Sequence, residues 1–134
     1  MKKLIYVFAL FAILTSCDSD NETALDVDPI VGNWQLQSSI EDGDEIITEC
    51  EKNTTIFFDA NGTAIIKSFY DEGNGCLSET DNATWVNAGN STYKLDGDDA
   101  VAISFSANNT VFSVTTSDTF NGMTYTMVIT YKKI

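Results

Sequence analysis

The sequence contains no histidine and no arginine, and these two absences narrow the chemistry that the chain can perform. Without histidine there is no imidazole to activate a serine nucleophile or to bind a metal ion. Seven lysines are the only basic side chains, against twenty aspartates and glutamates, so the formal net charge is −13. A surface of this sign repels nucleic-acid phosphates, which excludes nucleic acid as a partner.

The sequence also lacks an apolar run long enough to cross a bilayer as a helix. The longest run, residues 4–14, has eleven residues, against about 20 required. It follows two lysines and ends at Leu14, the first residue of the sequence Leu-Thr-Ser-Cys, whose last residue is Cys17. This order is typical of a secretory signal peptide. Small residues directly before a cysteine resemble the lipobox of bacterial lipoproteins, which implies cleavage before Cys17 and lipid attachment to its thiol; an ordinary signal peptide cleaved near a cysteine is the alternative.

Three segments are therefore predicted: a lipoprotein signal peptide at 1–16, an acidic disordered tether at 17–28 that begins with lipidated Cys17, and a domain at 29–134. Removal of the signal leaves five lysines against twenty acidic residues, a net charge of −15. Acidic residues directly after the cysteine resemble the surface-export signal of lipoproteins from the Bacteroidota. This implies an outer-membrane lipid anchor, with the cell surface favoured over the periplasmic side. The enterobacterial rule for aspartate after the cysteine would instead retain the protein at the inner membrane.

Cys50 and Cys76 remain after lipidation of Cys17, and in an exported chain a disulfide is their expected state. Two free thiols are the alternative. Between them lies a predicted hairpin that turns at Asn61-Gly62. Its two arms have similar lengths, which brings both cysteines near the same open end of the hairpin. We expect a structural bridge that closes a loop of about 26 residues.

After Pro29 no segment has a helical period over three turns, and apolar and polar residues alternate instead. In the first predicted strand Trp34, Leu36 and Ser38 share one face. Residues 46–52 are ambiguous and are interpreted as a short helical turn. The predicted strands are residues 32–38, 54–58, 62–70, 83–87, 91–95, 101–106, 110–116 and 123–132. Hairpin-length connections favour an all-β, antiparallel up-and-down β-barrel of about eight strands, whose closure removes exposed edges.

Several residues on these strands resemble the lipocalin-like lipoproteins of the Bacteroidota. Gly32-Asn33-Trp34 is similar to the Gly-x-Trp signature of the first lipocalin strand. The paired cysteines around a Phe-Phe-Asp-x-Asn-Gly-Thr hairpin, and Trp85 on the fourth strand, fit the same family. The resemblance covers residues 29–134 and implies an eight-stranded barrel with a cavity for a small apolar ligand.

Two features depart from that family. Many lipocalins carry an arginine on the last strand that packs over the first-strand tryptophan, whereas here only Lys132 or Lys133 is available, as a poor substitute. No segment has the length of the helix that often packs beside the barrel.

Inward-facing aromatic residues are the candidate ligand contacts. An eight-stranded barrel is just wide enough to be filled by side chains or to hold one small ligand, so these residues form either a core or a pocket. The candidates are Phe57 (with Phe58 as the alternative), Phe69, Trp85, Phe105, Phe112, Tyr125 and Tyr131. Trp34 is expected in the core.

No catalytic site, metal site or cofactor is expected. The carboxylates of Asp44-Glu45 and of Asp98-Asp99 are adjacent in sequence, and neighbours on a strand point to opposite faces. Acidic turns can bind calcium, but the spacing of the acidic residues in these turns matches no EF-hand loop. We expect a monomeric, lipid-anchored, non-catalytic binding module for a small hydrophobic molecule. A surface interaction or structural barrel with a filled core and no ligand is the alternative.

Overall fold

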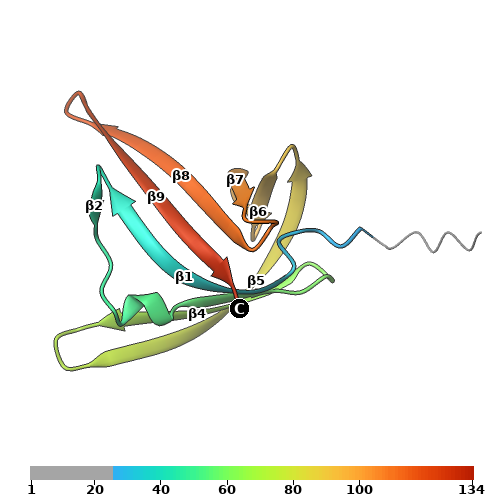
Figure 1. Cartoon of the computed structure of the whole chain (residues 1–134), viewed down its shortest axis with the longest axis horizontal. Coiled ribbons are helices and arrows are strands. Elements are labelled where there is room, and N and C mark those ends of the chain that lie inside the picture. Colours follow the sequence, from blue (N-terminus) through green and yellow to red (C-terminus); the bar gives the residue numbers. More distant parts are fainter. Residues whose placement is uncertain (1–25) are drawn as a thin grey trace, which may run out of the picture.

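Nine strands and one short 3-10 helix make up residues 26–134, the part of the chain that the computed structural model describes (Figure 1). The elements are β1 (Gly32–Glu41), β2 (Asp44–Glu45), η1 (Glu51–Asn53), β3 (Thr55–Phe58), β4 (Thr63–Asp71), β5 (Cys76–Gly89), β6 (Thr92–Leu95), β7 (Val101–Ser106), β8 (Val111–Phe120) and β9 (Met123–Lys133). The predicted signal peptide, lipidated Cys17 and most of the tether lie outside the described residues. Within residues 26–134, no helix has the length and apolar character needed to cross a membrane.

Strand pairing closes the sheet into a barrel. From β3 onward each strand pairs with the next along the chain, β3 pairs with β1, and β9 returns to pair with β1. All pairings are antiparallel, and the two-residue β2 extends only the far end of β1. Eight strands therefore form a closed up-and-down barrel, which confirms the predicted fold class.

Three strands extend at least three residues beyond their predicted ends, and β1 is one of them because it continues past Ser38 to Glu41. β5 begins at Cys76 rather than near Ala83, because its polar first half pairs residue by residue with β4, from Asp71↔Cys76 to Ala64↔Ala83. β8 continues to Phe120, since it pairs with β9 over its whole length. Cross-strand pairing overrides the weak strand propensity of Ser-, Asp- and Asn-rich sequence. The helical turn predicted within 46–52 is η1, immediately after Cys50.

A β-bulge corrects the predicted face of β1. Leu36 pairs with Tyr131 but Ser38 pairs with Thr130, so Gln37 has no partner on β9. The extra residue shifts the alternation by one position. Ser39, 5% exposed, therefore points inward, and the prediction that Ser38 shares the face of Trp34 is wrong.

The core lies at one end of the barrel, which we call the closed end. Its buried residues are Ile30, Trp34, Phe58, Ala64, Ala83, Trp85, Tyr93, Ile103 and Phe112. Trp34 is completely buried, its ring centroid lies 4.7 Å from that of Phe112, and its indole N–H donates to the Ile30 carbonyl at 2.6 Å. The indole N–H of Trp85 donates to the Asp59 carbonyl at 2.9 Å. Both indoles thus bury their large apolar area with the polar atom satisfied.

The other end of the barrel flares open. The β4–β5 and β8–β9 hairpins extend beyond the core and diverge, with their tips apart on the left of Figure 1, while the described chain begins at the opposite side. Asn121 and Gly122, both with positive φ, make the two-residue turn at the β8–β9 tip. Of the bend or hairpin that Asn-Gly allows at this position, the structure has the hairpin.

Candidate binding site

The Lys133 side chain covers the Trp34 ring at the closed end of the barrel. Its Nζ lies 5.1 Å from the Trp34 ring centroid and donates to the Pro29 carbonyl at 3.4 Å. The lysine expected to be a poor substitute for arginine therefore makes the cation–π contact with the first-strand tryptophan. Gly32 leaves room for it: φ is +133°, and a Cβ there would lie 2.7 Å from Lys133 Cε. This explains the glycine of the Gly-x-Trp motif physically.

The segment that enters β1 is also attached at the closed end. The Asp28 carboxylate accepts hydrogen bonds from the Tyr93 hydroxyl at 2.8 Å, from Asn87 Nδ2 at 2.6 Å and from the Ile30 backbone N–H at 3.0 Å. Burial, with the hydrogen bond to the Asp28 carboxylate and its negative charge, raises the pKa of the Tyr93 hydroxyl well above its usual range. The last residues before the barrel are therefore held on the core rather than near the flared end.

Four of the predicted interior aromatics meet at this closed end. Trp85 and Phe112 are buried there, and Phe105 and Tyr131 pack against them half-buried. Tyr131 stacks on Phe112 with ring centroids 4.9 Å apart, and burial raises the pKa of its hydroxyl. With Tyr93 between Trp85 and Phe105, these rings form a continuous chain of contacts, so they fill the barrel as a core.

Phe57 and Phe69 are not interior residues, and their predicted placement is wrong. Phe58, at 2% exposure, is the inward residue of β3, so its neighbour Phe57 faces outward. On β4 the buried Ala64 sets the inward positions, and Phe69 falls on the opposite face. There its ring lies 5.0 Å from Lys67 Nζ.

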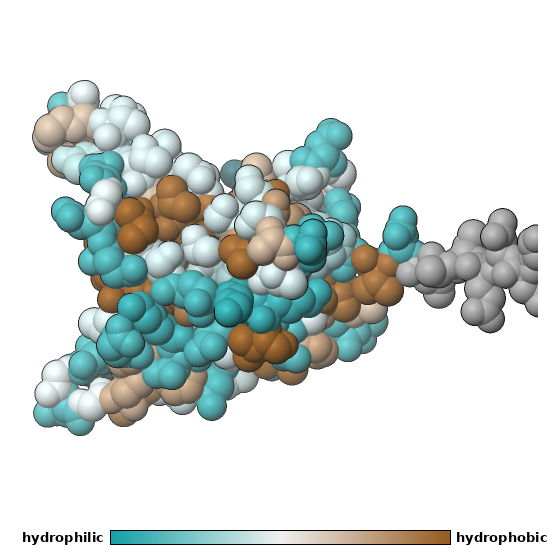
Figure 2. Space-filling model, viewed as in Figure 1, coloured by the Kyte–Doolittle hydropathy of each residue, from teal (hydrophilic) through white to brown (hydrophobic). Residues whose placement is uncertain are grey.

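A cleft of about 430 Å³ lies at the flared end on the inner side of β1, β8 and β9. Its lining residues are Glu41, Thr116, Ser117, Asp118, Tyr125 and Met127. The register explains how they meet: Met127 of β9 pairs with Glu41 on one side and with Thr116 on the other, and Asp118 pairs with Tyr125. Figure 2 shows the molecule hollowed between the two hairpin lobes on this side.

Tyr125 is the only sequence-predicted aromatic candidate that lines this cleft. The acidic and hydroxyl residues around it were missed, although a signal was present. Asp118 continues the alternation of Phe112 and Val114 along β8, and Met127 shares a face with Tyr125 along β9. Extending the two-residue alternation of inward-facing side chains through the polar half of β8 identifies Thr116 and Asp118, whereas Glu41 follows only from the pairing of β1 with β9.

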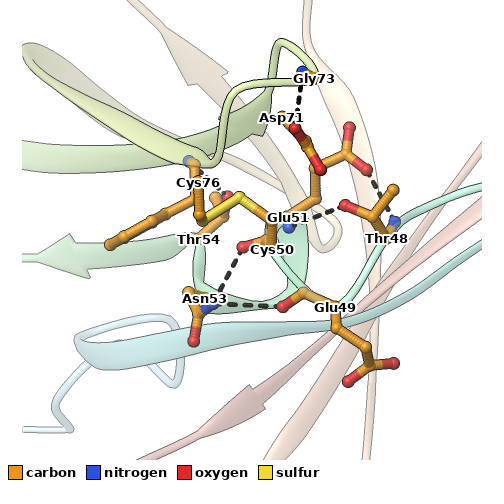
Figure 3. Close-up of a disulfide and its surroundings, with 10 residues drawn as sticks. Thr48, Glu49, Cys50, Glu51, Asn53, Thr54, Asp71, Gly73 and Cys76 are labelled. Carbon is orange, nitrogen blue, oxygen red and sulfur yellow. Dashed lines mark hydrogen bonds between the residues drawn. A yellow bond between two sulfur atoms is a disulfide. The ribbon is translucent and has the colours of Figure 1, made fainter.

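A disulfide ties two segments together at the flared end (Figure 3). Cys50 and Cys76 are bonded with their Cα atoms 5.5 Å apart, which confirms the predicted pairing. Thr48 and Glu51 exchange hydrogen bonds beside it: the Thr48 N–H donates to Glu51 Oε2 at 2.7 Å and the Glu51 N–H donates to Thr48 Oγ1 at 3.3 Å. This capping-box pairing fixes the turn that presents Cys50 to the first residue of β5.

A second depression, of about 380 Å³, lies over β4 and β5 beside Asp96. Its lining includes Thr63, Ile65, Asn82 and Thr84, which face outward because Ala64 and Ala83 face the core. The Asp96 carboxylate already accepts from the Thr84 N–H at 2.7 Å. Among residues 26–134, no group of three or more His, Cys, Asp or Glu side chains is arranged to hold a metal ion.

Comparison with known proteins places this barrel in a family. A search of curated proteins gives no match. Among solved structures, the siderocalin Ex-FABP, described as functioning through dual ligand specificities, aligns over 80% of this chain and 71% of its own at 13% identity, with a TM-score of 0.44. The family model of the lipocalin-like domain matches residues 30–117, which run from the segment before β1 into β8 and leave out β9. The chain therefore belongs to the lipocalin-like domain family.

Proposed function

We propose that this protein is a non-catalytic binding module that holds one small, largely apolar molecule in the cleft at its flared end, and that a lipid on Cys17 anchors it as a monomer in the bacterial outer membrane. Lipocalin-like domains are in general binding proteins rather than enzymes. The observation that carries the ligand proposal is the contrast between the two halves of the barrel. The closed half is filled by aromatic side chains, whereas the flared half contains a cleft of about 430 Å³.

The size and lining of the cleft support a small ligand. Protein sites for small molecules occupy roughly 300–1,000 Å³ and combine apolar contact with a few placed polar groups. Tyr125 and Met127 supply polarisable apolar surface, and Thr116 supplies a hydroxyl group. Because Met side chains have adaptable shapes, Met127 can fit an irregular ligand body.

The direction of the chain supports exposure of the cleft to the solvent. Asp28 is bound to Tyr93 and Asn87 at the closed end. An anchor that precedes Asp28 would therefore turn the closed end toward the membrane and the flared end away from it. On the outer membrane, with the surface side favoured, such a cleft would sample molecules in the medium.

Labelling with a palmitate analogue in the source organism tests the anchor. We expect the label in the wild-type protein and in the membrane fraction, and its loss in Cys17→Ser. An unlabelled wild-type protein that keeps residues 1–16 would reject the anchor while leaving the ligand proposal intact. Protease treatment of intact cells then distinguishes the surface from the periplasmic side.

Native mass spectrometry of protein purified from its source tests the ligand proposal. We expect one added mass that disappears on denaturation, together with a monomeric protein mass. Protein that never carries an added mass would reject the proposed binding function.

A second candidate function is an interaction barrel without a small ligand. Phe120 and Met123, 67% and 57% exposed at the β8–β9 tip, favour it. Exposed apolar side chains at a protruding tip are typical of contact sites. This candidate predicts that Phe120→Ser abolishes a cellular partner's co-purification and that the protein is empty in native mass spectrometry.

A further inference from the structure

Two carboxylates share the cleft with an aromatic ring and a thioether. Glu41 ends β1, and Asp118 lies near the end of β8. In the register, Glu41 pairs with Met127 and Asp118 pairs with Tyr125. Side-chain alternation places Glu41, Asp118, Met127 and Tyr125 on the inner face of the sheet, between Tyr131 and the tip of the β8–β9 hairpin.

No lysine of the described chain lines this cleft. The lysines of residues 26–134 are Lys52, Lys67, Lys94, Lys132 and Lys133. Lys52 Nζ pairs with Glu49 at 2.8 Å, and Lys133 lies over Trp34 at the closed end. Within the described residues the two cleft carboxylates therefore have no salt-bridge partner.

The charge of the whole molecule reinforces this local charge. The net charge of −13 produces a negative potential, and a concave wall of the same sign concentrates it. An anionic ligand would meet repulsion at the cleft, whereas a cation would be drawn into it. A dehydrated metal ion is disfavoured, because hard cations take about six to eight oxygen ligands. The described chain has no cluster of three or more metal-ligating residues.

We propose that the cleft selects a small organic cation, in which a protonated amine or quaternary ammonium group is joined to an apolar or aromatic body. This inference rests on the proposed function, since it assigns the charge of the ligand in the same cleft. The ammonium group lies between the Glu41 and Asp118 carboxylates, where the face of Tyr125 adds a cation–π contact. The apolar body contacts Met127, as thioethers favour aromatic and aliphatic partners.

Three indole compounds of similar size test the charge preference. Tryptamine is the cation, 3-ethylindole its neutral match and indole-3-propionate its anion. Calorimetric or NMR titration of the mature protein should show tryptamine binding at least tenfold more tightly than the other two. Its affinity should fall as salt is raised, because salt screens attraction between partly exposed charges.

Matched variants locate the interaction. Glu41→Gln and Asp118→Asn keep the side-chain shape and remove one charge each, and each should weaken tryptamine binding by roughly tenfold. Asp99→Asn removes the same charge from an exposed turn that does not line the cleft, and it should change the affinity less than twofold. A thermal melt of each variant confirms that the fold is retained.

The outcomes separate this inference from the proposed function. Equal binding of tryptamine and 3-ethylindole, with NMR shifts at Tyr125 and Met127, would overturn the cation preference and leave an apolar binding site. Equal losses in Asp99→Asn and the two cleft variants would also overturn it, because the effect would then belong to net charge. Absence of binding by all three compounds would overturn the inference, and the proposed function would stand or fall on native mass spectrometry.

Discussion

Lys133 and Trp34 form a cation–π contact at the closed end of the barrel, and the neighbouring Lys132 serves as a control for Lys133. Lys133→Met keeps an apolar stem over the indole but removes the charge that lies 5.1 Å from the ring. We expect a loss of about 0.5–2 kcal/mol in the free energy of unfolding, measured by urea denaturation. Lys132→Met, on the outward face, should change it little. Equal effects of the two variants would contradict the assigned role of Lys133.

Substitution of Gly32 should destabilise the fold because of its backbone conformation and its close approach to Lys133. Gly32→Ala places a side chain at φ of +133°, with its Cβ 2.7 Å from Lys133 Cε. The expected cost is about 1–3 kcal/mol. In the double variant with Lys133→Ala, which has no Cε, the steric part is relieved and the backbone part remains, so the double variant should lose less stability than the sum of the two single losses. Full additivity in the denaturation data would show that the close approach is unimportant.

Tyr93 makes a pH-dependent contribution to stability. Its pKa in the folded protein is raised by burial and by Asp28, whereas in the unfolded chain it titrates near 10. Below about pH 10 both states keep the proton; above it the unfolded state loses the proton first, so stability falls as pH rises.

Unfolding measured from pH 8 to 11 tests this contribution by comparing wild type with Tyr93→Phe. Without an ionisable hydroxyl at this position, the variant should show a shallower alkaline fall, by up to about 1.4 kcal/mol per pH unit. Tyr131, whose pKa is also raised, accounts for part of the remaining slope. Parallel curves for the two proteins would contradict the account of Tyr93.

At the scale of elements, the disulfide joins the η1 turn to the start of β5 across a separation of 26 residues. Closing a loop of this length stabilises the fold by roughly 3–4 kcal/mol in the chain-entropy model. The double variant Cys50→Ala/Cys76→Ala, which leaves no unpaired thiol at this bridge, should lower the melting temperature by about 10 °C or more. A wild-type melting temperature that is the same with and without reductant would contradict a structural role.

The sequence predicted the existence of the strands better than their ends or faces. Asn61-Gly62 and Asn121-Gly122 specify hairpins locally, and the length of the first hairpin brought Cys50 and Cys76 together. In contrast, Ser38 was assigned the wrong face because the bulge arises from pairing with β9, nearly a hundred residues later. The choice of Phe57 over Phe58 was wrong because two adjacent aromatic residues carry no local sign of which one faces the core.

At the scale of the whole molecule, the barrel divides into a filled half and an open half. The aromatic residues that suggested a pocket in the sequence are mostly those that fill the core, since large apolar side chains gain most from complete burial. The cleft is built instead from Glu41, Thr116, Asp118 and Met127 around Tyr125. The alternation along β8 and β9 indicates Thr116, Asp118 and Met127, but only the register of β1 with β9 shows that Glu41 lies beside them.

Native mass spectrometry on two neighbouring variants tests the central claim, that the ligand occupies the flared end, most directly. Thr116→Trp fills the cleft from its inner face, whereas Thr115→Trp adds the same bulk to the outer face of β8. The account predicts that protein purified from its source loses the bound mass in Thr116→Trp and keeps it in Thr115→Trp. Retention of the bound mass by both variants would show that the ligand lies elsewhere and would contradict the account.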